Sequence, residues 1–177
     1  MSALASESVE VRSPGRLLTS GCGVAVLAAP QLPPTRAESK YMDEFVNLGG
    51  TLVVAGTGPV TNEVLRSLGV NVTIVNATVV DLVERVNSSL ELSVPVSLSG
   101  GLESLVLLNA SPLRLGSGVT AIGNSSIFAF TLPLVKNLTP PYVLVAMRSM
   151  GLGRIIVIGS QYAFVNGVFD YNRFLLN

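Results

Sequence analysis

The sequence of 177 residues contains no histidine and only one cysteine, Cys22. Without histidine, the chain cannot form the Cys-His pair that activates many catalytic thiols. A single cysteine cannot close an internal disulfide, and it excludes zinc sites made of four cysteines or of cysteine and histidine. We therefore expect a domain with no catalytic activity, no cofactor and no metal ion.

Charged residues are scarce as well, at 12% of the chain against about 25% in an average soluble domain. Eleven Lys and Arg balance eleven Asp and Glu. The basic residues are scattered singly, so the chain offers no basic patch that could neutralise a phosphate backbone. We exclude nucleic acid as a partner.

The sequence is rich in apolar residues, with 49% hydrophobic residues and a mean hydropathy of +0.58. It nevertheless lacks the run of about 20 apolar residues that a membrane-spanning helix needs. Its longest uncharged stretch, residues 115–135, is interrupted by glycine, asparagine and proline, a pattern that indicates β-structure. Any contact with a membrane is expected only through segments outside this chain.

Asparagine is placed in an unusual pattern. The eleven asparagines form six Asn-x-Ser/Thr acceptor motifs for N-glycosylation, where chance predicts about two. The acceptor residues are Asn71, Asn76, Asn87, Asn109, Asn124 and Asn137. Asn, Ser and Thr also share turns and strand ends, which is the alternative explanation. The motifs favour a glycosylated surface on an extracellular, cell-surface protein, where glycans supply the solubility that charge usually provides.

The first residues of the chain do not form a signal peptide, because they lack a basic start and a long apolar core. For a secreted protein, we therefore expect the targeting segment and a membrane anchor to lie outside residues 1–177. We also expect the chain to form one domain, because 177 residues are enough for one hydrophobic core.

The first part of the chain alternates strands and helices. Residues 8–12 have the period of a half-buried strand, and residues 23–30 form an apolar run typical of a central parallel strand. Thr35 and Glu38 have the spacing of a capping box and predict a helix over 36–48. A buried strand over 51–56 and a short helix over 62–68 follow, with Thr61 as its cap. This order indicates a parallel sheet.

The middle of the chain has a different pattern. Short apolar segments, separated by turn residues every eight to twelve positions, predict a β-rich insertion over 71–141. They lie at 72–75, 90–96, 104–108, 119–122 and 127–132, and a helical turn is expected at 81–86. The C-terminal part predicts a β-hairpin of strands 142–148 and 154–159, and then a helix over 171–176.

Two parts of the sequence resemble a known family. They are YMDEFVNLGGTLVVA at 41–55 with NEVLRSLGV at 62–70, and GLGRIIVIGSQYAFVN at 151–166 with DYNRFLLN at 170–177. These segments resemble uncharacterised extracytoplasmic domains with a class I glutamine amidotransferase-like, or flavodoxin-like, fold. Such domains occur in accessory proteins of gliding-motility-type ABC transporters and in an intraflagellar transport subunit. The resemblance also implies a strand and part of a helix before Met1.

The resemblance and the acceptor motifs together predict an archaeal cell-surface protein. We expect an α/β fold with a parallel, flavodoxin-like or amidotransferase-like sheet and helices on both faces. Residues 8–70 and 142–177 would form this core, which would carry the β-rich insertion and the C-terminal hairpin. Catalytic members of such a fold use a cysteine with a histidine, and this chain retains only Cys22, ahead of a strand rather than after one.

The sequence offers three candidate sites. Cys22 lies between two glycines, where an accessible thiol is possible, but a small loop residue is the simpler interpretation. The segment 56–61 lies between a strand and a helix, as phosphate-binding loops do, yet it lacks their third glycine and their lysine, which favours a tight turn. Polar residues follow the last strand, at the end of the sheet where ligands usually bind. They are Ser160, Gln161, Asn166, Asp170 and Asn172.

Paired carboxylates are the remaining candidates. Asp43 and Glu44 are neighbours on a helix and point to different sides, which excludes a glycosidase pair. Asp81 and Glu84 are three residues apart, and we expect them to lie on a solvated face.

We therefore predict a non-catalytic domain that acts in cell-surface assembly or as an accessory module of a membrane protein. Its partners would be other cell-surface or membrane proteins, further copies of itself, and N-glycans. The alternative is a module that binds a carbohydrate or another small polar ligand at the 160–172 end of the sheet. A hydrolase that works without histidine is the third hypothesis, and it lacks a base to activate a nucleophile.

Overall fold

The computed structural model describes residues 23–88, 90–98, 101–164 and 172–176. The described residues form two α-helices, eleven strands and a C-terminal 3-10 turn. The helices are α1 (Arg36–Asn47) and α2 (Gly58–Ser67), and the 3-10 turn is η2 (Arg173–Leu176). The strands are β1 (Val24–Ala28), β2 (Thr51–Ala55), β3 (Val72–Ile74), β4 (Thr78–Val80), β5 (Glu91–Leu98), β6 (Gly101–Leu108), β7 (Leu113–Leu115), β8 (Thr120–Asn124), β9 (Phe130–Leu132), β10 (Val143–Met150) and β11 (Gly153–Ile158).

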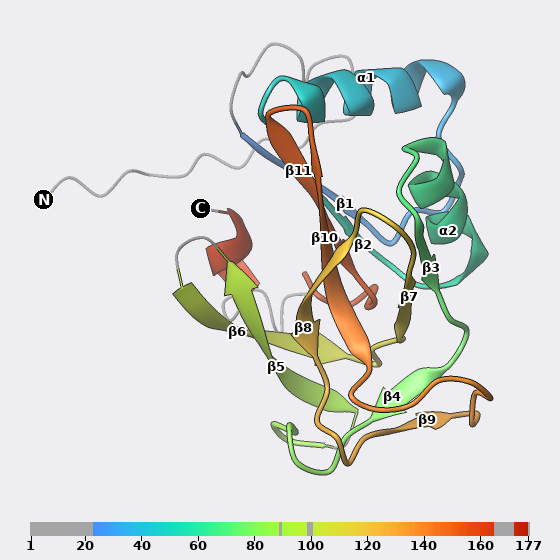
Figure 1. The fold of residues 1–177 in the computed structure, drawn as a ribbon, viewed down its shortest axis with the longest axis vertical. Coiled ribbons are helices and arrows are strands. Elements are labelled where there is room, and N and C mark those ends of the chain that lie inside the picture. Colours follow the sequence, from blue (N-terminus) through green and yellow to red (C-terminus); the bar gives the residue numbers. More distant parts are fainter. Residues whose placement is uncertain (1–22, 89, 99–100, 165–171, 177) are drawn as a thin grey trace, which may run out of the picture.

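Seven of these strands form one mixed sheet in the order β1-β2-β11-β10-β8-β5-β6 (Figure 1). β1, β2 and β11 are parallel, and every later pair is antiparallel. Two small ladders, β3 with β7 and β4 with β9, lie beside this sheet. Parallel and antiparallel pairing therefore meet at β11, which has a parallel neighbour on one side and an antiparallel one on the other.

The predicted capping box at the start of α1 is confirmed. The hydroxyl oxygen of Thr35 accepts the backbone N–H of Glu38 at 3.3 Å, and the Glu38 carboxylate accepts the Thr35 N–H at 2.7 Å. The carboxylate also accepts the Thr35 hydroxyl at 2.8 Å. The bonds that Glu38 accepts, first from the Thr35 backbone and then from its side chain, lower the pKa of Glu38. Met42, Phe45 and Val46 form the buried stripe of the helix.

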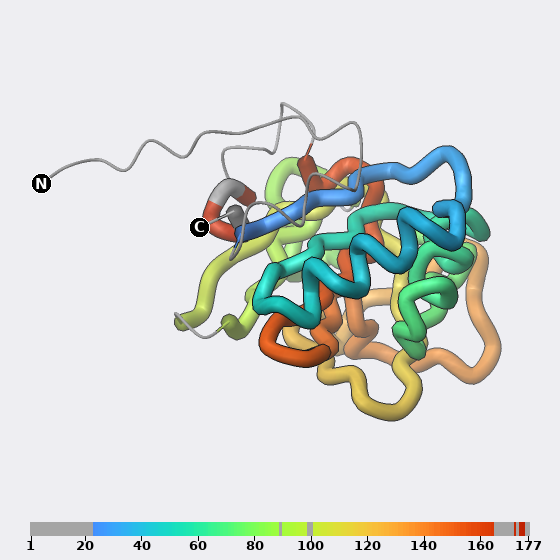
Figure 2. The backbone as a smooth tube through the Cα atoms, turned by 90° about the horizontal axis from the view of Figure 1, so that it is seen from above, coloured from blue at the N-terminus to red at the C-terminus, as the bar shows by residue number. Residues whose placement is uncertain are grey.

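Both helices pack on the same face of the sheet, as Figure 2 shows from above. Side chains alternate between the two faces of a strand. Leu52 and Val54 of β2, with Ile155 and Val157 of β11, therefore face the helices and pack against Phe45, Val46, Val64 and Leu65. Both α-helices of the described residues thus lie on one face, so the expectation of helices on both faces is wrong.

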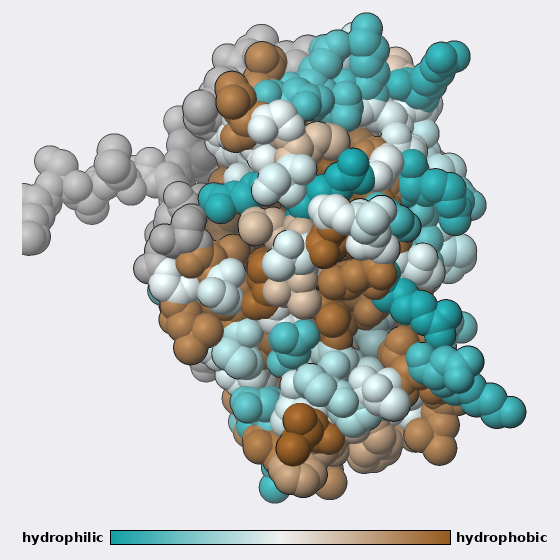
Figure 3. Space-filling model, in the orientation of Figure 1, coloured by the Kyte–Doolittle hydropathy of each residue, from teal (hydrophilic) through white to brown (hydrophobic). Residues whose placement is uncertain are grey.

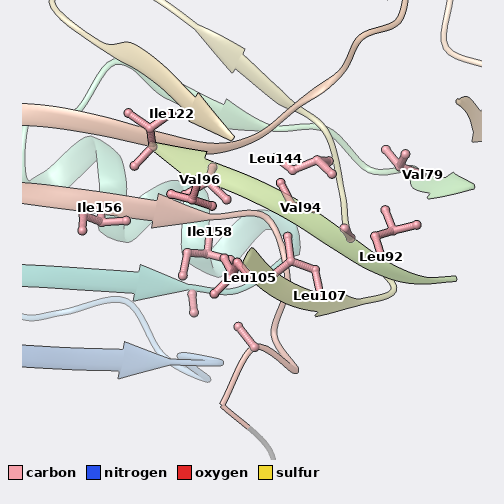
Figure 4. Packing of buried hydrophobic residues seen from close by; sticks show 14 of the residues in the cluster. Val79, Leu92, Val94, Val96, Leu105, Leu107, Ile122, Leu144, Ile156 and Ile158 are labelled. Carbon is pink, nitrogen blue, oxygen red and sulfur yellow. The ribbon is translucent and has the colours of Figure 1, made fainter. Parts of the chain in front are cut away.

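The opposite face is covered by the sheet itself, which curls into a half-barrel. Val53, Ile156 and Ile158 on this face pack against Val94 and Leu105 of β5 and β6. Figure 4 shows Ile156 and Ile158 next to these two side chains. All five side chains are almost fully buried. The strands of the middle segment thus serve as the second layer that a flavodoxin-like fold would build from helices.

Two local features allow the sheet to bend at β8. The pairing of β8 with β10 shifts register on both sides of Val145, and such bulges bend and twist a strand. Gly123 pairs with Val145 on one side and with Val96 of β5 on the other. A Cβ atom at Gly123 would lie 3.1 Å from Val145 and Val94, so glycine permits this close approach. Bulge and glycine together bring β5 and β6 back over the sheet.

The predicted fold class is therefore wrong: the protein is mostly β-structure, with a curled mixed sheet instead of a helix-covered parallel core. β1 is an edge strand among the described residues, not a central one. Segment 71–141 is not a separate insertion in the sheet, because β5, β6 and β8 are members of it. The C-terminal hairpin is present as predicted, and the division of the chain into domains stays a prediction.

Several smaller expectations also change. Helix α2 begins at Gly58 with Thr57 as its cap, and Thr61 lies inside it. Segment 81–86 forms bends rather than a helical turn, and the last helix is the 3-10 turn η2. The predicted strand at 8–12 lies outside the described residues.

Candidate functional site

A cleft of about 440 Å³ opens at the carboxyl ends of the parallel strands β2 and β11. We call it the polar cleft. Its lining residues are Thr57, Gly58, Asn76, Ala77, Thr78, Asn109, Ser111, Leu132, Pro133, Gln161 and Tyr162. Carboxyl ends of neighbouring parallel strands meet at one edge of a sheet, where α/β proteins usually bind ligands. None of the lining residues carries a charge.

The first wall of the cleft is the turn from β2 into α2. Gly56 has no space for a side chain, since a Cβ atom would collide with the Thr61 hydroxyl. Gly58 has a φ of 78°, a conformation that favours glycine. The Thr57 hydroxyl donates to the side-chain oxygen of Gln161 at 3.3 Å, which joins this turn to the segment after β11.

The second wall comes from two segments of the middle region. The backbone N–H groups of Val75 and Val79 donate to the carbonyls of Pro112 and Ala110 at 2.9 and 2.7 Å. The Ser111 N–H donates to the Gly159 carbonyl directly after β11. These bonds hold residues 76–78 and 109–111 beside the end of β11, so segments far apart in sequence line one cleft.

The five residues predicted as ligand-binding have different surroundings. Gln161 lines the polar cleft. Ser160 is fully buried, and its hydroxyl donates to the Leu108 carbonyl at 2.6 Å. Asn172 is fully buried too, and its amide pairs with both the N–H and the carbonyl of Val106 at 2.8 Å. The side chains of Ser160 and Asn172 therefore form their hydrogen bonds within the protein and not with a ligand in the cleft. Asn166 and Asp170 lie outside the described residues, as does Cys22.

A second site, which sequence reasoning missed, is centred on Asp81. This residue is fully buried, contrary to the expected solvated face. One carboxylate oxygen accepts the N–H groups of Val83 and Glu84 at 2.9 and 3.2 Å and the Ser126 hydroxyl at 2.8 Å. The other accepts the Ser126 N–H at 2.7 Å. Asp81 thereby ties two loops together, although its partner Ser126 is 45 residues away in sequence.

The electrostatics of this site follow from its hydrogen bonds. Burial raises the pKa of the Asp81 carboxyl, but the bonds from Val83, Ser126 and Glu84 outweigh burial and hold the pKa below its ordinary value of 3.8. The carboxylate is therefore ionised near neutral pH, and its charge is compensated by donors rather than by a basic side chain.

The two loops that Asp81 joins present apolar side chains to solvent. We call this region the apolar end. It comprises Leu82, Val83, Val86, Ile127, Phe128, Phe130, Leu132 and Leu134, all exposed large hydrophobic residues. Phe130 and Leu132 are on β9, whose ladder with β4 places them next to the loops. Figure 3 shows hydrophobic side chains gathered at the lower end of the molecule, where Figure 1 places β4 and β9.

All six asparagines of the acceptor motifs are exposed: Asn71, Asn76, Asn87, Asn109, Asn124 and Asn137. Exposure is the ordinary state of asparagine, so it does not test glycan attachment. Two of the six, Asn76 and Asn109, line the polar cleft.

The described part of the chain contains no cluster of three or more Cys, Asp or Glu side chains that could hold a metal ion. Within the same residues, no helix combines the length and the apolar character needed to cross a membrane.

Several solved structures of other proteins are similar to this chain. The solved structure named "mmIFT52 N-terminal domain" is 17% identical, covers 93% of this chain and 76% of its own, and has a TM-score of 0.64. Two from Salmonella typhimurium, Cytoplasmic Protein STM1381 and Cytoplasmic Protein STM3548, are 11% and 10% identical, with TM-scores of 0.47 and 0.43. Each alignment spans 95% of this chain; it spans 74% of STM1381 and 75% of STM3548. No curated protein matches the sequence.

These findings correct several predictions. The expected kinship with amidotransferase-like domains and archaeal cell-surface proteins is corrected, whereas the expected likeness to an intraflagellar transport subunit agrees with the fold of the IFT52 domain. Nothing in these comparisons supports the predicted extracellular, membrane-anchored location, and we do not retain it. The interpretation as a glycoprotein likewise finds no support among the similar proteins, and we do not retain it.

Similarity at this level of identity establishes the fold, whereas a sequence-family match establishes membership. One family model matches residues 3–177, which is nearly the whole chain. The chain belongs to the family described as "Domain of unknown function (DUF4350)".

Proposed function

We propose that this domain is a non-catalytic protein-interaction module that docks a partner protein on its apolar end. The observation that supports the proposal is the pair of loops joined by Asp81. Exposed apolar side chains are common singly, but a group of them at one end of a domain is typical of an interaction surface.

The buried carboxylate gives this surface a fixed shape. Asp81 accepts four hydrogen bonds from the two loops, and the Ser126 hydroxyl also accepts the Phe128 N–H at 3.1 Å. The Glu84 carbonyl accepts the Ser93 N–H at 2.8 Å, which attaches the first loop to β5. A surface ordered before binding loses less conformational entropy when a partner docks. The loops thus combine exposure with order, which a binding surface requires.

The composition supports a role without catalysis. The sequence has no histidine, so an activated Cys-His nucleophile cannot form. The pKa of Asp81 is lowered rather than raised, whereas a carboxyl that acts as a general acid near neutral pH needs a raised pKa.

Site-specific photo-crosslinking tests the proposal. A photoreactive amino acid replaces Phe128, which is 67% exposed, in cells that naturally make the protein. We expect a discrete adduct with one partner protein, identified by mass spectrometry. The matched control carries the same amino acid at Leu152, which is 85% exposed on the β10–β11 turn and distant in sequence from both loops.

The purified partner then allows a quantitative test. We expect Phe128→Ser to weaken binding at least tenfold, because a central aromatic side chain of an interface contributes on the order of 1–2 kcal/mol or more. Leu152→Ser should leave the affinity unchanged. Equal adduct formation at positions 128 and 152, or no loss of affinity in folded Phe128→Ser, would refute the proposal.

A further inference from the structure

The polar cleft has a property that the interaction module does not need: it is lined by hydrogen-bonding groups and by no charged side chain. Its volume of about 440 Å³ falls within the range of small-molecule sites, about 300–1,000 Å³. An uncharged wall offers no ion pair to a charged ligand, which would lose its hydration on entry. The lining therefore favours a neutral ligand.

Several polar groups in the cleft have unused hydrogen-bonding capacity. Ser111 is only 6% exposed and lines the cleft, and its hydroxyl makes no hydrogen bond within the part of the chain that the structure describes. The side chains of Asn76, Thr78 and Asn109 likewise have no hydrogen-bond partner among the described residues. Among the described residues no buried side-chain nitrogen or oxygen lacks a hydrogen-bond partner, so the Ser111 hydroxyl is open to the cleft and can pair with a ligand there.

The fold holds the side chain of Gln161 on one side of the cleft and the backbone of Asn109 on the other. Gln161 accepts the Thr57 hydroxyl on its side-chain oxygen, which leaves the two hydrogens of its amide nitrogen to donate. Asn109 has a φ of 48°, and its backbone N–H donates to the Leu90 carbonyl at 2.9 Å. Amides and hydroxyls both donate and accept, and ligand hydroxyl groups do the same. This complementarity points to a ligand with many hydroxyl groups.

The cleft also has apolar contact surface. Tyr162 lines it after β11, and so do Leu132, the last residue of β9, and Pro133, which follows it. Sugars have polar edges and an apolar face of C–H groups, and an aromatic ring next to hydrogen-bonding side chains suits both. We propose that the polar cleft binds a neutral carbohydrate of one or two rings.

A small anion is the competing ligand, because the cleft includes the beginning of α2. The Thr57 side chain accepts no capping hydrogen bond from this helix, so the first N–H groups of the helix are available, and a helix N-terminus attracts negative charge. However, Pro59 lacks an N–H group, and no Lys or Arg lines the cleft. The charge and the donors expected of an anion site are thus incomplete, and the anion becomes an outcome of the test.

The test uses saturation-transfer NMR and titration calorimetry with the full chain. The probes are neutral monosaccharides and disaccharides (glucose, galactose, mannose, cellobiose and lactose), with phosphate, sulfate and acetate as anions. We expect at least one sugar to bind in the millimolar range or tighter, and the anions to bind at least tenfold more weakly. Binding of anions in preference to sugars, or of no sugar at all, would overturn the proposal.

Variants then locate the binding site. Ser111→Ala and Gln161→Leu should each weaken sugar binding about tenfold, because each removes groups that a sugar hydroxyl would bind. Gln161→Leu is the safeguard if Ser111→Ala fails to fold, since Gln161 is only partly buried. The control is Asn87→Ala, an exposed asparagine outside the cleft, and it should not change binding. Unchanged binding in both cleft variants would place the sugar elsewhere and refute the assignment. Phe128→Ser leaves the cleft intact, so the protein-interaction proposal can fail independently.

Discussion

Replacing Asp81 should measure how much its hydrogen bonds contribute to the stability of the fold. The comparison is with an exposed carboxylate that makes no such bonds. Alanine removes the acceptor of four hydrogen bonds and leaves the N–H groups of Val83, Glu84 and Ser126 without their partner. Each unpaired buried group costs about 1–3 kcal/mol, and water can reach some of them after the loops relax. We expect Asp81→Ala to lower the free energy of unfolding by roughly 3–5 kcal/mol.

Asparagine is the more informative replacement. It retains the shape and one acceptor oxygen, which can keep the bonds from Val83, Glu84 and the Ser126 hydroxyl. Its amide nitrogen would then face the Ser126 N–H, donor against donor. We expect Asp81→Asn to cost about 1–2 kcal/mol at neutral pH. Glu103→Gln is the control, because Glu103 is an exposed carboxylate on β6, and it should change stability by no more than about 0.5 kcal/mol.

The contribution of Asp81 to the free energy of unfolding should change with pH in a direction that can be measured. The pKa of folded Asp81 lies below 3.8, its ordinary value in the unfolded chain. A lowered pKa means that the folded protein binds the proton more weakly than the unfolded chain does. The stabilising contribution is therefore fully present above the unfolded pKa and is lost as the pH falls through 3.8 toward the folded pKa.

Urea unfolding of the wild type, Asp81→Asn and Glu103→Gln across this pH window provides the measurement. The stability difference between wild type and Asp81→Asn should be constant near neutral pH and should shrink below 3.8. A difference that grows on acidification, or a cost no larger than that of Glu103→Gln, would refute the reasoning. Hydrogen exchange should speed up in both loops of Asp81→Asn, and an unchanged exchange rate would show that Asp81 does not order them.

Three further substitutions test parts of the fold by the same unfolding measurement. Thr35→Ala removes the cap of α1 and should cost about 1 kcal/mol, most of which Thr35→Ser should restore. Gly153→Ala should cost at least about 2 kcal/mol, because its Cβ would collide with backbone carbonyls of α1 and of the turn after it; Gly23→Ala is the control, with no atom within 4 Å of its Cβ. Asn172→Ala should cost about 2–4 kcal/mol, since it leaves a buried N–H and a buried carbonyl of β6 unpaired. A cost below about 0.5 kcal/mol in any of the three would contradict its explanation.

Local signals in the sequence predict local structure well. The Thr35–Glu38 spacing predicts the start of α1, because both partners of a capping box lie within one helical turn. The C-terminal hairpin is predicted equally well, since its two apolar runs are joined by a glycine turn, and Gly151 has a φ of 57°. The sequence predicts the start of α2 four residues too late, because Gly58-Pro59 is also typical of a turn. Proline in the first turn is equally a sign of a helix start.

The curl of the sheet could not be predicted in this way. Alternation reveals a strand but not its neighbours, and β8 joins β10 to β5 through contacts between distant segments. Gly123 looks like a turn residue in sequence, and its role emerges only when Val94 and Val145 approach it from two strands. The burial of Asp81 could not be predicted for the same reason, because its donor Ser126 is remote in sequence. A polar residue between apolar ones looks solvated until its distant partner is known.

The predicted ligand site coincides with a defined cleft although the predicted fold class is wrong. The reason is that β2 and β11 are parallel. The expected ligand site depends only on β2 and β11 running in the same direction, since their carboxyl ends then coincide. That relation holds here, from the pairing of Arg154 with Thr51 to that of Ile158 with Ala55. It brings Thr57 and Gln161 into contact.

The curl of the sheet supplies the opposite wall of the cleft. It brings residues 76–78 and 109–111 to the same edge of the sheet, which a sheet covered by helices would not do. The cleft therefore depends on both kinds of pairing, which meet at β11.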